Sequence, residues 1–318
     1  MTIHRLLCGL RLDGPSVLAL WEGNLRQRAK QMRCIPTPSS TAVKLNMRLL
    51  PTELILLVLD HLDVEGLLAT LRAFPVLANL VSRRHFKKRD ANGDTILHRL
   101  ILLDDSVLLR LLFCNRMVDL NVKAKCDFTP LTVAVDHSRI GLVQLLLERD
   151  DVDLNAQDSF GLTPLHHAMV WGGTDVVRLL LAKPNLAVNA KELSGRTPLS
   201  YTMSAYEYTE VNVEAIALLL EKVDIDADSQ DNGGRTPLSW AAEMWELDAV
   251  RMLLQRDDVD PASVDETGMT PLQYAAERED SGYADDELFR LLMERTGVQE
   301  ITRYLLDGHA AHWKLSEL

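Results

Sequence analysis

The chain has 318 residues, 47% hydrophobic and 25% charged, a composition typical of a folded protein and unlike that of a disordered one. Its net charge of −12 is unevenly distributed along the chain. Residues 1–47 contain 7 basic and 2 acidic side chains, residues 48–89 contain 7 basic and 4 acidic, and residues 90–318 contain 20 basic and 40 acidic. Because the acidic part repels phosphate and no 18-residue stretch lacks a charge, we expect neither a nucleic-acid partner nor a membrane.

The cysteines predict a reducing compartment. Cys8, Cys34, Cys114 and Cys126 form no C-x-x-C pair, so the sequence predicts neither a disulfide framework nor a zinc site. We expect the protein in the cytoplasm, with the nucleus as the alternative because the segment 82–89 is strongly basic.

Residues 1–46 are predicted to be an N-terminal extension and linker. The run Pro36-Thr37-Pro38-Ser39-Ser40-Thr41 has the composition of a linker. Upstream of it, residues 16–33 fit either a helix or a disordered segment.

Residues 47–89 have a proline, Pro51, near a predicted helix start and leucines at helical intervals after it. An acidic break separates this stretch from a second leucine-rich stretch. This segment resembles the first half of an F-box, and the residues that carry the resemblance are Leu50, Pro51, Glu53, Leu54, Leu57, Leu62, Asp63 and Leu67. In that family these positions bind the Skp-type linker of a cullin ubiquitin ligase. Pro75 departs from the usual second half. The alternative interpretation is that these helices only cap the open end of the repeats that follow.

One tetrad then returns six times, beginning at Thr95, Thr129, Thr163, Thr197, Thr236 and Thr270, with spacings of 34, 34, 34, 39 and 34 residues. Threonine can cap a helix, and proline suits the first helical position, so each tetrad predicts a helix start. A glycine lies two residues before five of these threonines, where a turn needs a positive φ; Asp127 takes its place in the second unit. A second, apolar helix follows each first helix.

This period and tetrad resemble the ankyrin repeat over residues 90–297. The resemblance implies an all-α fold, an ankyrin-repeat solenoid of helix-turn-helix units with hairpin fingers, preceded by the small F-box-like helical segment. It also implies that His98 and His166, fourth in their tetrads, bond to the backbone of the adjacent finger. Residues 298–318 are predicted to be a C-terminal capping helix and tail. Insertions at 205–210 and 279–286 are predicted between the two helices of their units.

No nucleophile, phosphate-binding or metal-ligand motif appears, so we expect neither an enzyme nor a cofactor nor a metal. The order of segments is similar to that of filamentous-fungal F-box/ankyrin proteins. It implies an adaptor that binds the Skp-type linker through the first segment and an unidentified protein target through the repeats. An ankyrin scaffold whose first helices only cap it is the alternative, and an enzyme with an unrecognised pocket ranks below both.

Target contacts in the ankyrin family lie at the finger tips and early in the first helices. The corresponding positions are Phe128, Phe160, Leu162, Val170, Trp171, Arg196, Arg235, Met244 and Met269. Among them Phe128, Phe160, Leu162 and Trp171 predict an apolar patch on the second and third repeats. The competing interpretation is that these side chains pack in the core.

Overall fold

Helices are the only regular elements in the part of the chain that the computed structural model describes, residues 52–114, 118–204, 212–277 and 286–297. The chain divides into two compact units between Lys125 and Cys126, and each is described by itself. The predicted extension 1–46, tail 298–318 and both insertions lie outside the described residues, apart from the final residue of the second insertion, and so do Leu50 and Pro51.

The first unit contains the F-box-like segment and the first repeat. Its elements are α3 (Thr52–His61), α4 (Val64–Ala73), a 3-10 helix (Pro75–Leu80), α5 (Arg83–Phe86), α6 (Ile96–Leu102) and α7 (Ser106–Phe113). The predicted departure at Pro75 is thus a 3-10 helix, because proline has no N–H to continue an α-helix and fits a helix start instead. Asp63 caps α4 by accepting a hydrogen bond from Gly66 N at 2.8 Å.

Helix α4 packs on α6, the first helix of the first repeat. Leu67 and Leu71 of α4 are fully buried. At the edges of this contact Arg72 pairs with Asp105, and Arg99 with Glu65, each at 2.9 Å. This helix therefore covers the apolar surface that an end repeat would otherwise expose.

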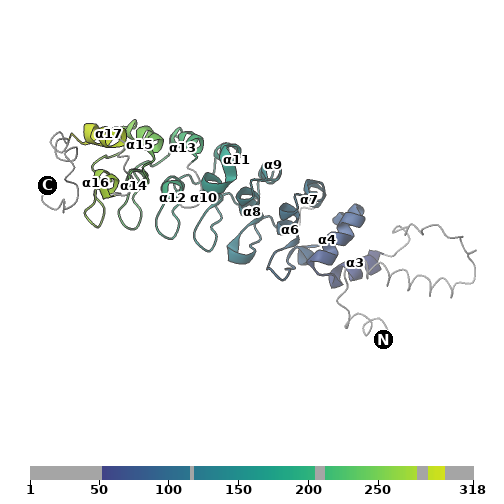
Figure 1. Ribbon diagram of the computed structural model, residues 1–318. Coiled ribbons are helices and arrows are strands. Elements are labelled where there is room, and N and C mark those ends of the chain that lie inside the picture. The colour runs from purple at the N-terminus through teal and green to yellow at the C-terminus, as the bar shows by residue number, and fades with distance from the viewer. Residues whose placement is uncertain (1–51, 115–117, 205–211, 278–285, 298–318) are drawn as a thin grey trace, which may run out of the picture. The chain divides into compact units, whose positions relative to one another are not determined.

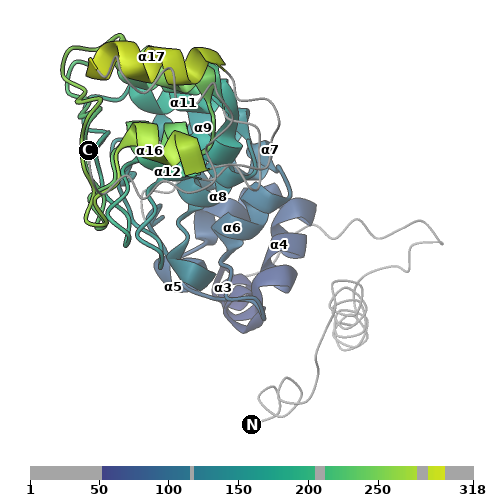
Figure 2. The ribbon, with the colours of Figure 1, turned by 60° about the vertical axis from the view of Figure 1, so that its left-hand side comes forward.

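The described part of the second unit contains five helix pairs. They are α8 (Pro130–Asp136) with α9 (Ile140–Leu147), α10 (Pro164–His167) with α11 (Gly173–Leu181), α12 (Pro198–Ser204) with α13 (Val213–Leu220), α14 (Pro237–Glu243) with α15 (Leu247–Leu254), and α16 (Pro271–Glu277) with α17 (Asp286–Thr296). A π-helical turn, Ala168–Gly172, joins α10 to α11. Within this unit the first helices form one row and the second helices another, and the fingers lie side by side beyond the first row (Figures 1 and 2).

Each tetrad threonine stands immediately before a helix, as predicted. Thr129 Oγ1, for example, accepts a hydrogen bond from Thr132 N at 3.2 Å. The fourth tetrad residue closes the cap from the other side: His166 Nδ1 accepts from Thr163 N at 3.1 Å. Such reciprocal bonds satisfy backbone groups that would otherwise have no partner at a helix start.

The predicted turn positions have positive φ. Gly161, Gly195 and Gly234 have φ near +80°, and Asp127, which replaces glycine, has φ +61°. Glycine is needed at Gly195 for a second reason, since a Cβ there would lie 2.6 Å from Asn232 N in the next finger. The fingers of repeats three to six stack this closely because each donates a backbone hydrogen bond to the finger before it, as Asn232 N does to Ser194 O at 3.0 Å.

Candidate functional site

In five of the six repeats a carboxylate three residues before the turn glycine holds the finger in shape. Asp158 shows the arrangement: its Oδ1 accepts hydrogen bonds from Phe160 N at 2.8 Å and from Leu162 N at 2.9 Å. The same pair of backbone bonds occurs at Asp90, Glu192, Asp231 and Asp265. These carboxylates therefore stabilise the loop rather than forming reactive acid pairs.

In three repeats the second oxygen of this carboxylate binds a ring nine residues later, on the first helix. His167 Nε2 lies 2.9 Å from Asp158 Oδ2, and Trp240 Nε1 donates to Asp231 Oδ2 at 2.9 Å. The Tyr274 hydroxyl donates to Asp265 in the same way. Together with Tyr201, which has the same position in its repeat, these rings make up what we call the ring row: His167, Tyr201, Trp240 and Tyr274. One side chain in each of these three repeats thus ties its finger to its helix.

The side chain before a tetrad threonine contacts the ring row of the next repeat. Phe128 meets the His167 ring edge-on at 5.2 Å between centroids. The Arg196 guanidinium lies 5.7 Å from the Trp240 ring, and that of Arg235 lies 4.0 Å from the Tyr274 ring.

Each arginine also contacts the ring of its own repeat, Arg196 at 5.1 Å from Tyr201 and Arg235 at 3.6 Å from Trp240. Rings and guanidinium groups therefore alternate across repeats four to six, held by cation–π attraction. We call this set the arginine–aromatic ladder: Arg196, Tyr201, Arg235, Trp240 and Tyr274.

Both ladder arginines are neutralised within the unit. Arg196 Nε donates to Glu192 Oε1 at 3.0 Å, and Arg235 pairs with Glu243 at 2.5 Å. Because each guanidinium has both a carboxylate and a ring as partners, the ladder offers flat aromatic and guanidinium surfaces rather than a net positive charge.

His167 is the buried member of the ring row. Its Nδ1 lies 3.2 Å from Asp136 Oδ1, so both ring nitrogens face carboxylates. Burial lowers the pKa of His167, but the bonds to Asp136 and Asp158 outweigh burial and hold that pKa above its ordinary value. Carboxylates only accept, so both bonds form when both nitrogens donate, which is the imidazolium form. Phe128 and Trp171, at 5.2 and 5.3 Å, flank this ring.

The structure separates the predicted target-binding residues. Phe128 and Trp171 meet around His167, and Arg196 and Arg235 meet in the ladder. Phe160 is 58% exposed at a finger tip. Val170, Met244 and Met269 are half-buried.

The predicted apolar patch does not include Leu162, because this side chain is only 6% exposed. It closes the base of its finger, where its carbonyl accepts from Asp158 N at 3.0 Å, so it belongs to the core. The exposed apolar neighbour of Phe160 is instead Leu193, 71% exposed on the next finger and bonded through its N–H to Phe160 O at 3.2 Å.

The F-box-like residues are also divided by burial. On α3 Glu53 and Leu57 are exposed, Leu57 to 42%, while Leu54 is half-buried. Leu62, just after α3, is also half-buried. Leu67 is fully buried in α4. The Leu67 side chain is therefore part of the core of the first unit in this structure, and its contact with a linker stays a prediction.

Tyr201, Trp240 and Tyr274 were not predicted as site residues. A signal was available, since each stands four residues after its tetrad threonine, as His167 does. The predicted backbone role of the fourth tetrad position is confirmed at His166, whose Nε2 lies 3.2 Å from Arg196 O in the next finger. Burial lowers the pKa of His166 to about 4, which leaves it neutral at pH 7.

Within the described ranges, no cluster of three or more His, Cys, Asp or Glu side chains has the arrangement of a metal site. Within the same ranges, no helix is both long and apolar enough to cross a membrane.

Residues 97–192, 151–225 and 202–307 match the family model for ankyrin repeats (3 copies). A search of curated proteins found no match. The matched residues include the whole ring row and ladder, and they begin after the F-box-like segment. Ankyrin repeats are protein–protein interaction domains, so the array that carries these side chains is an interaction domain.

Proposed function

Since the chain belongs to the ankyrin-repeat family, we propose that it is a non-enzymatic adaptor and, more narrowly, a substrate-recognition subunit of a cullin-type ubiquitin ligase. In this proposal α3 binds the Skp-type linker and the repeats of residues 126–297 bind the protein to be modified. The observation that carries the narrower proposal is the different burial of the two F-box-like helices.

Helix α4 buries its leucines against the first repeat, whereas α3 leaves leucine side chains accessible. Leu57 is 42% exposed, and Leu54, Leu56 and Val58 are half-buried. A helix that served only as a cap would turn its apolar side chains inward, as α4 does with Leu67. Accessible leucines beside exposed Glu53 fit a helix that receives a partner.

The contact between α4 and α6 favours the second candidate, an ankyrin scaffold whose N-terminal helices act only as a cap. The two functions use different helices, so one segment can perform both. An experiment on α3 alone therefore separates them.

The experiment is capture of a purified Skp-type linker by the full chain and by two variants. Leu57→Glu places a charge on the accessible face of α3, and Val76→Glu is the matched control, since Val76 is also exposed in this unit and lies outside the F-box-like pattern. We expect wild type and Val76→Glu to capture the linker and Leu57→Glu to lose at least tenfold in affinity, which corresponds to about 1.4 kcal/mol.

Failure of the wild-type chain to capture the linker would overturn the ligase role and leave the scaffold. Equal capture by Leu57→Glu would show that α3 is not the contact. Circular dichroism of both variants checks that the helices remain, as the exposure of the two side chains leads us to expect.

A further inference from the structure

The basic side chains of segment 82–89 form two groups, one bound to the end of α3 and one lining a cavity. Arg84, His85 and Lys88 are bound to the end of α3: Arg84 and His85 pair with Asp60 at 2.8 and 2.9 Å, and the Lys88 ammonium donates to carbonyls including that of Asp60 at 2.8 Å. Burial lowers the pKa of Lys88, although Asp60 and Asp63 oppose the effect. These three side chains fix the segment in place.

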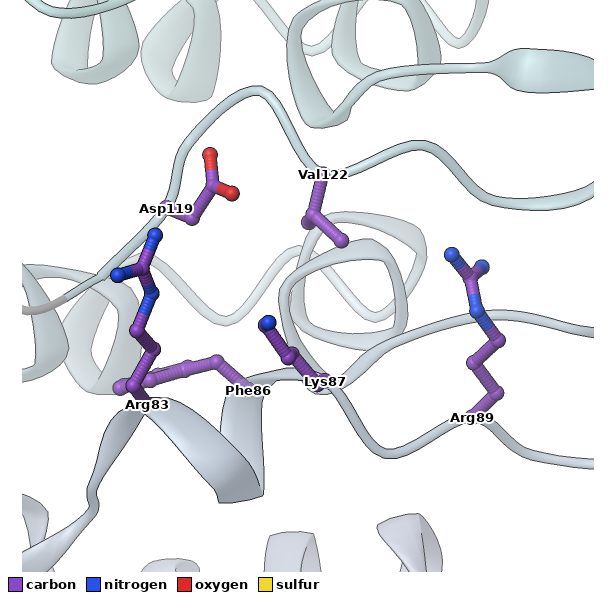
Figure 3. Close-up of a pocket in the computed structure, with 6 residues that line it drawn as sticks. All are labelled: Arg83, Phe86, Lys87, Arg89, Asp119 and Val122. Atoms are coloured by element: carbon purple, nitrogen blue, oxygen red, sulfur yellow. The ribbon is translucent and has the colours of Figure 1, made fainter.

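The remaining cations, Arg83, Lys87 and Arg89, line a cavity of about 290 Å³ with Phe86, Asp119 and Val122. Figure 3 shows their charged ends directed toward the loop that carries Asp119 and Val122. The Phe86 ring, 2% exposed, anchors α5 beneath them. All of these residues belong to the first unit.

The charge of this cavity is unusual for an acidic protein. Three cations face one carboxylate, a net charge of +2 in the lining. Arg89 is oriented by a bond from Nη1 to Gly93 O at 2.8 Å. Among the lining residues Asp119 is the one carboxylate, and the Arg83 guanidinium is directed toward it in Figure 3. Grouped cations repel one another, and an anion between them relieves that repulsion.

We propose that this cavity binds a phosphate monoester. Such a group carries a charge close to −2 at pH 7 and presents several acceptor oxygens, which matches both the net charge and the donors of the lining. A single carboxylate would leave half of the charge unpaired. A nucleic acid would need an extended basic surface, whereas residues 90–318 hold 20 basic against 40 acidic side chains. The anchoring of Lys88 and Phe86 keeps the cations close to their binding positions before a ligand arrives.

The inference stands apart from the proposed adaptor function, since no residue of α3 lines the cavity and the test needs no target. Its test is calorimetric titration of the full chain with inorganic phosphate and with N-acetyl-O-phosphoserine amide, at constant ionic strength made up with chloride. The variants are Arg83→Gln and Lys87→Gln. The matched control is Arg110→Gln, which removes one positive charge from an exposed position of α7 in the same unit.

We expect wild type and Arg110→Gln to bind alike and each cavity variant to bind on the order of tenfold more weakly, as befits loss of one charge-assisted contact. Binding of both probes would support a phosphate monoester carried on a peptide, whereas binding of inorganic phosphate alone would overturn the ester and leave a site for the free ion. Absence of binding to wild type, equal binding by the cavity variants, or an equal loss in Arg110→Gln would overturn the proposal.

Discussion

Mild acid should destabilise the unit of residues 126–318 through His166. This side chain is fully buried, its Nδ1 accepts from Thr163 N, and its Nε2 lies 3.2 Å from the carbonyl of Arg196. A protonated imidazole could no longer accept at Nδ1. Burial also disfavours the charged imidazolium, and it lowers the pKa of His166 to about 4, against 6.5 for an ordinary histidine.

The lowered pKa fixes the direction of the effect. Between pH 6.5 and 4 the His166 side chain is protonated in the unfolded chain and neutral in the folded chain. The free energy of unfolding therefore falls as the pH falls. At about 1.4 kcal/mol per pKa unit, this group alone removes about 2 kcal/mol between pH 7 and pH 5, and about 3 kcal/mol by pH 4. His167 has a raised pKa and contributes in the opposite direction, since its stabilisation is lost as the pH rises.

The chain supplies its own control substitution for this prediction. The sixth repeat has Gln273 at the position of His166, and its Oε1 accepts from Thr270 N at 2.7 Å. His166→Gln should therefore keep the cap without a titrating group. Urea unfolding of both proteins, followed by tryptophan fluorescence at pH 7 and pH 5, gives the change for each. We expect wild type to lose about 2 kcal/mol more than His166→Gln; parallel losses would refute the reasoning.

Two further predictions concern the fingers. Gly195→Ala should lower the free energy of unfolding by on the order of 3 kcal/mol, because the new Cβ would lie 2.6 Å from Asn232 N, whereas Gly268→Ala, with nothing within 4 Å and a similar φ, should cost about 1–2 kcal/mol. Equal costs in urea unfolding would show that close stacking of the fingers is unimportant. Once a target has been identified, Phe160→Ala and Trp171→Ala should each weaken its binding by about 1–3 kcal/mol, while Val223→Ala, a fully exposed control, should not; unchanged affinity in calorimetry would remove both residues from the binding face.

Features that depend on a few neighbouring residues could be predicted from the sequence. Thr163 caps its helix and Gly161 has positive φ for reasons contained within one tetrad and one turn. The repetition of both patterns gave the helix pairs and their starts. The burial of individual side chains was harder to predict. Phe160 and Leu162 lie on either side of the turn glycine, and only the fold of the finger turns Leu162 inward and Phe160 outward.

The ladder could not be predicted from one repeat, because its contacts join adjacent repeats. Arg235 stands before its own tetrad, yet its guanidinium lies between Trp240 of the same repeat and Tyr274 of the next. The linear sequence separates Arg235 from Tyr274 by a whole unit. Alignment of the repeats on their tetrad threonines places the four rings at one position, but the contact of each arginine with the ring of the next repeat appears only in the structure.

The second repeat lacks both groups of the hydrogen bond between finger carboxylate and ring. The position of the finger carboxylate is occupied there by Ala124, and the position of the ring nine residues later by Val133. Both partners of the finger–helix hydrogen bond are therefore missing together in this repeat, so neither group is left there without the other. A buried acid or donor retained alone would be left without its partner. The bond in the third, fifth and sixth repeats is thus part of the architecture. What remains accessible for a target is the outer surface of the rings, their arginines and the finger tips.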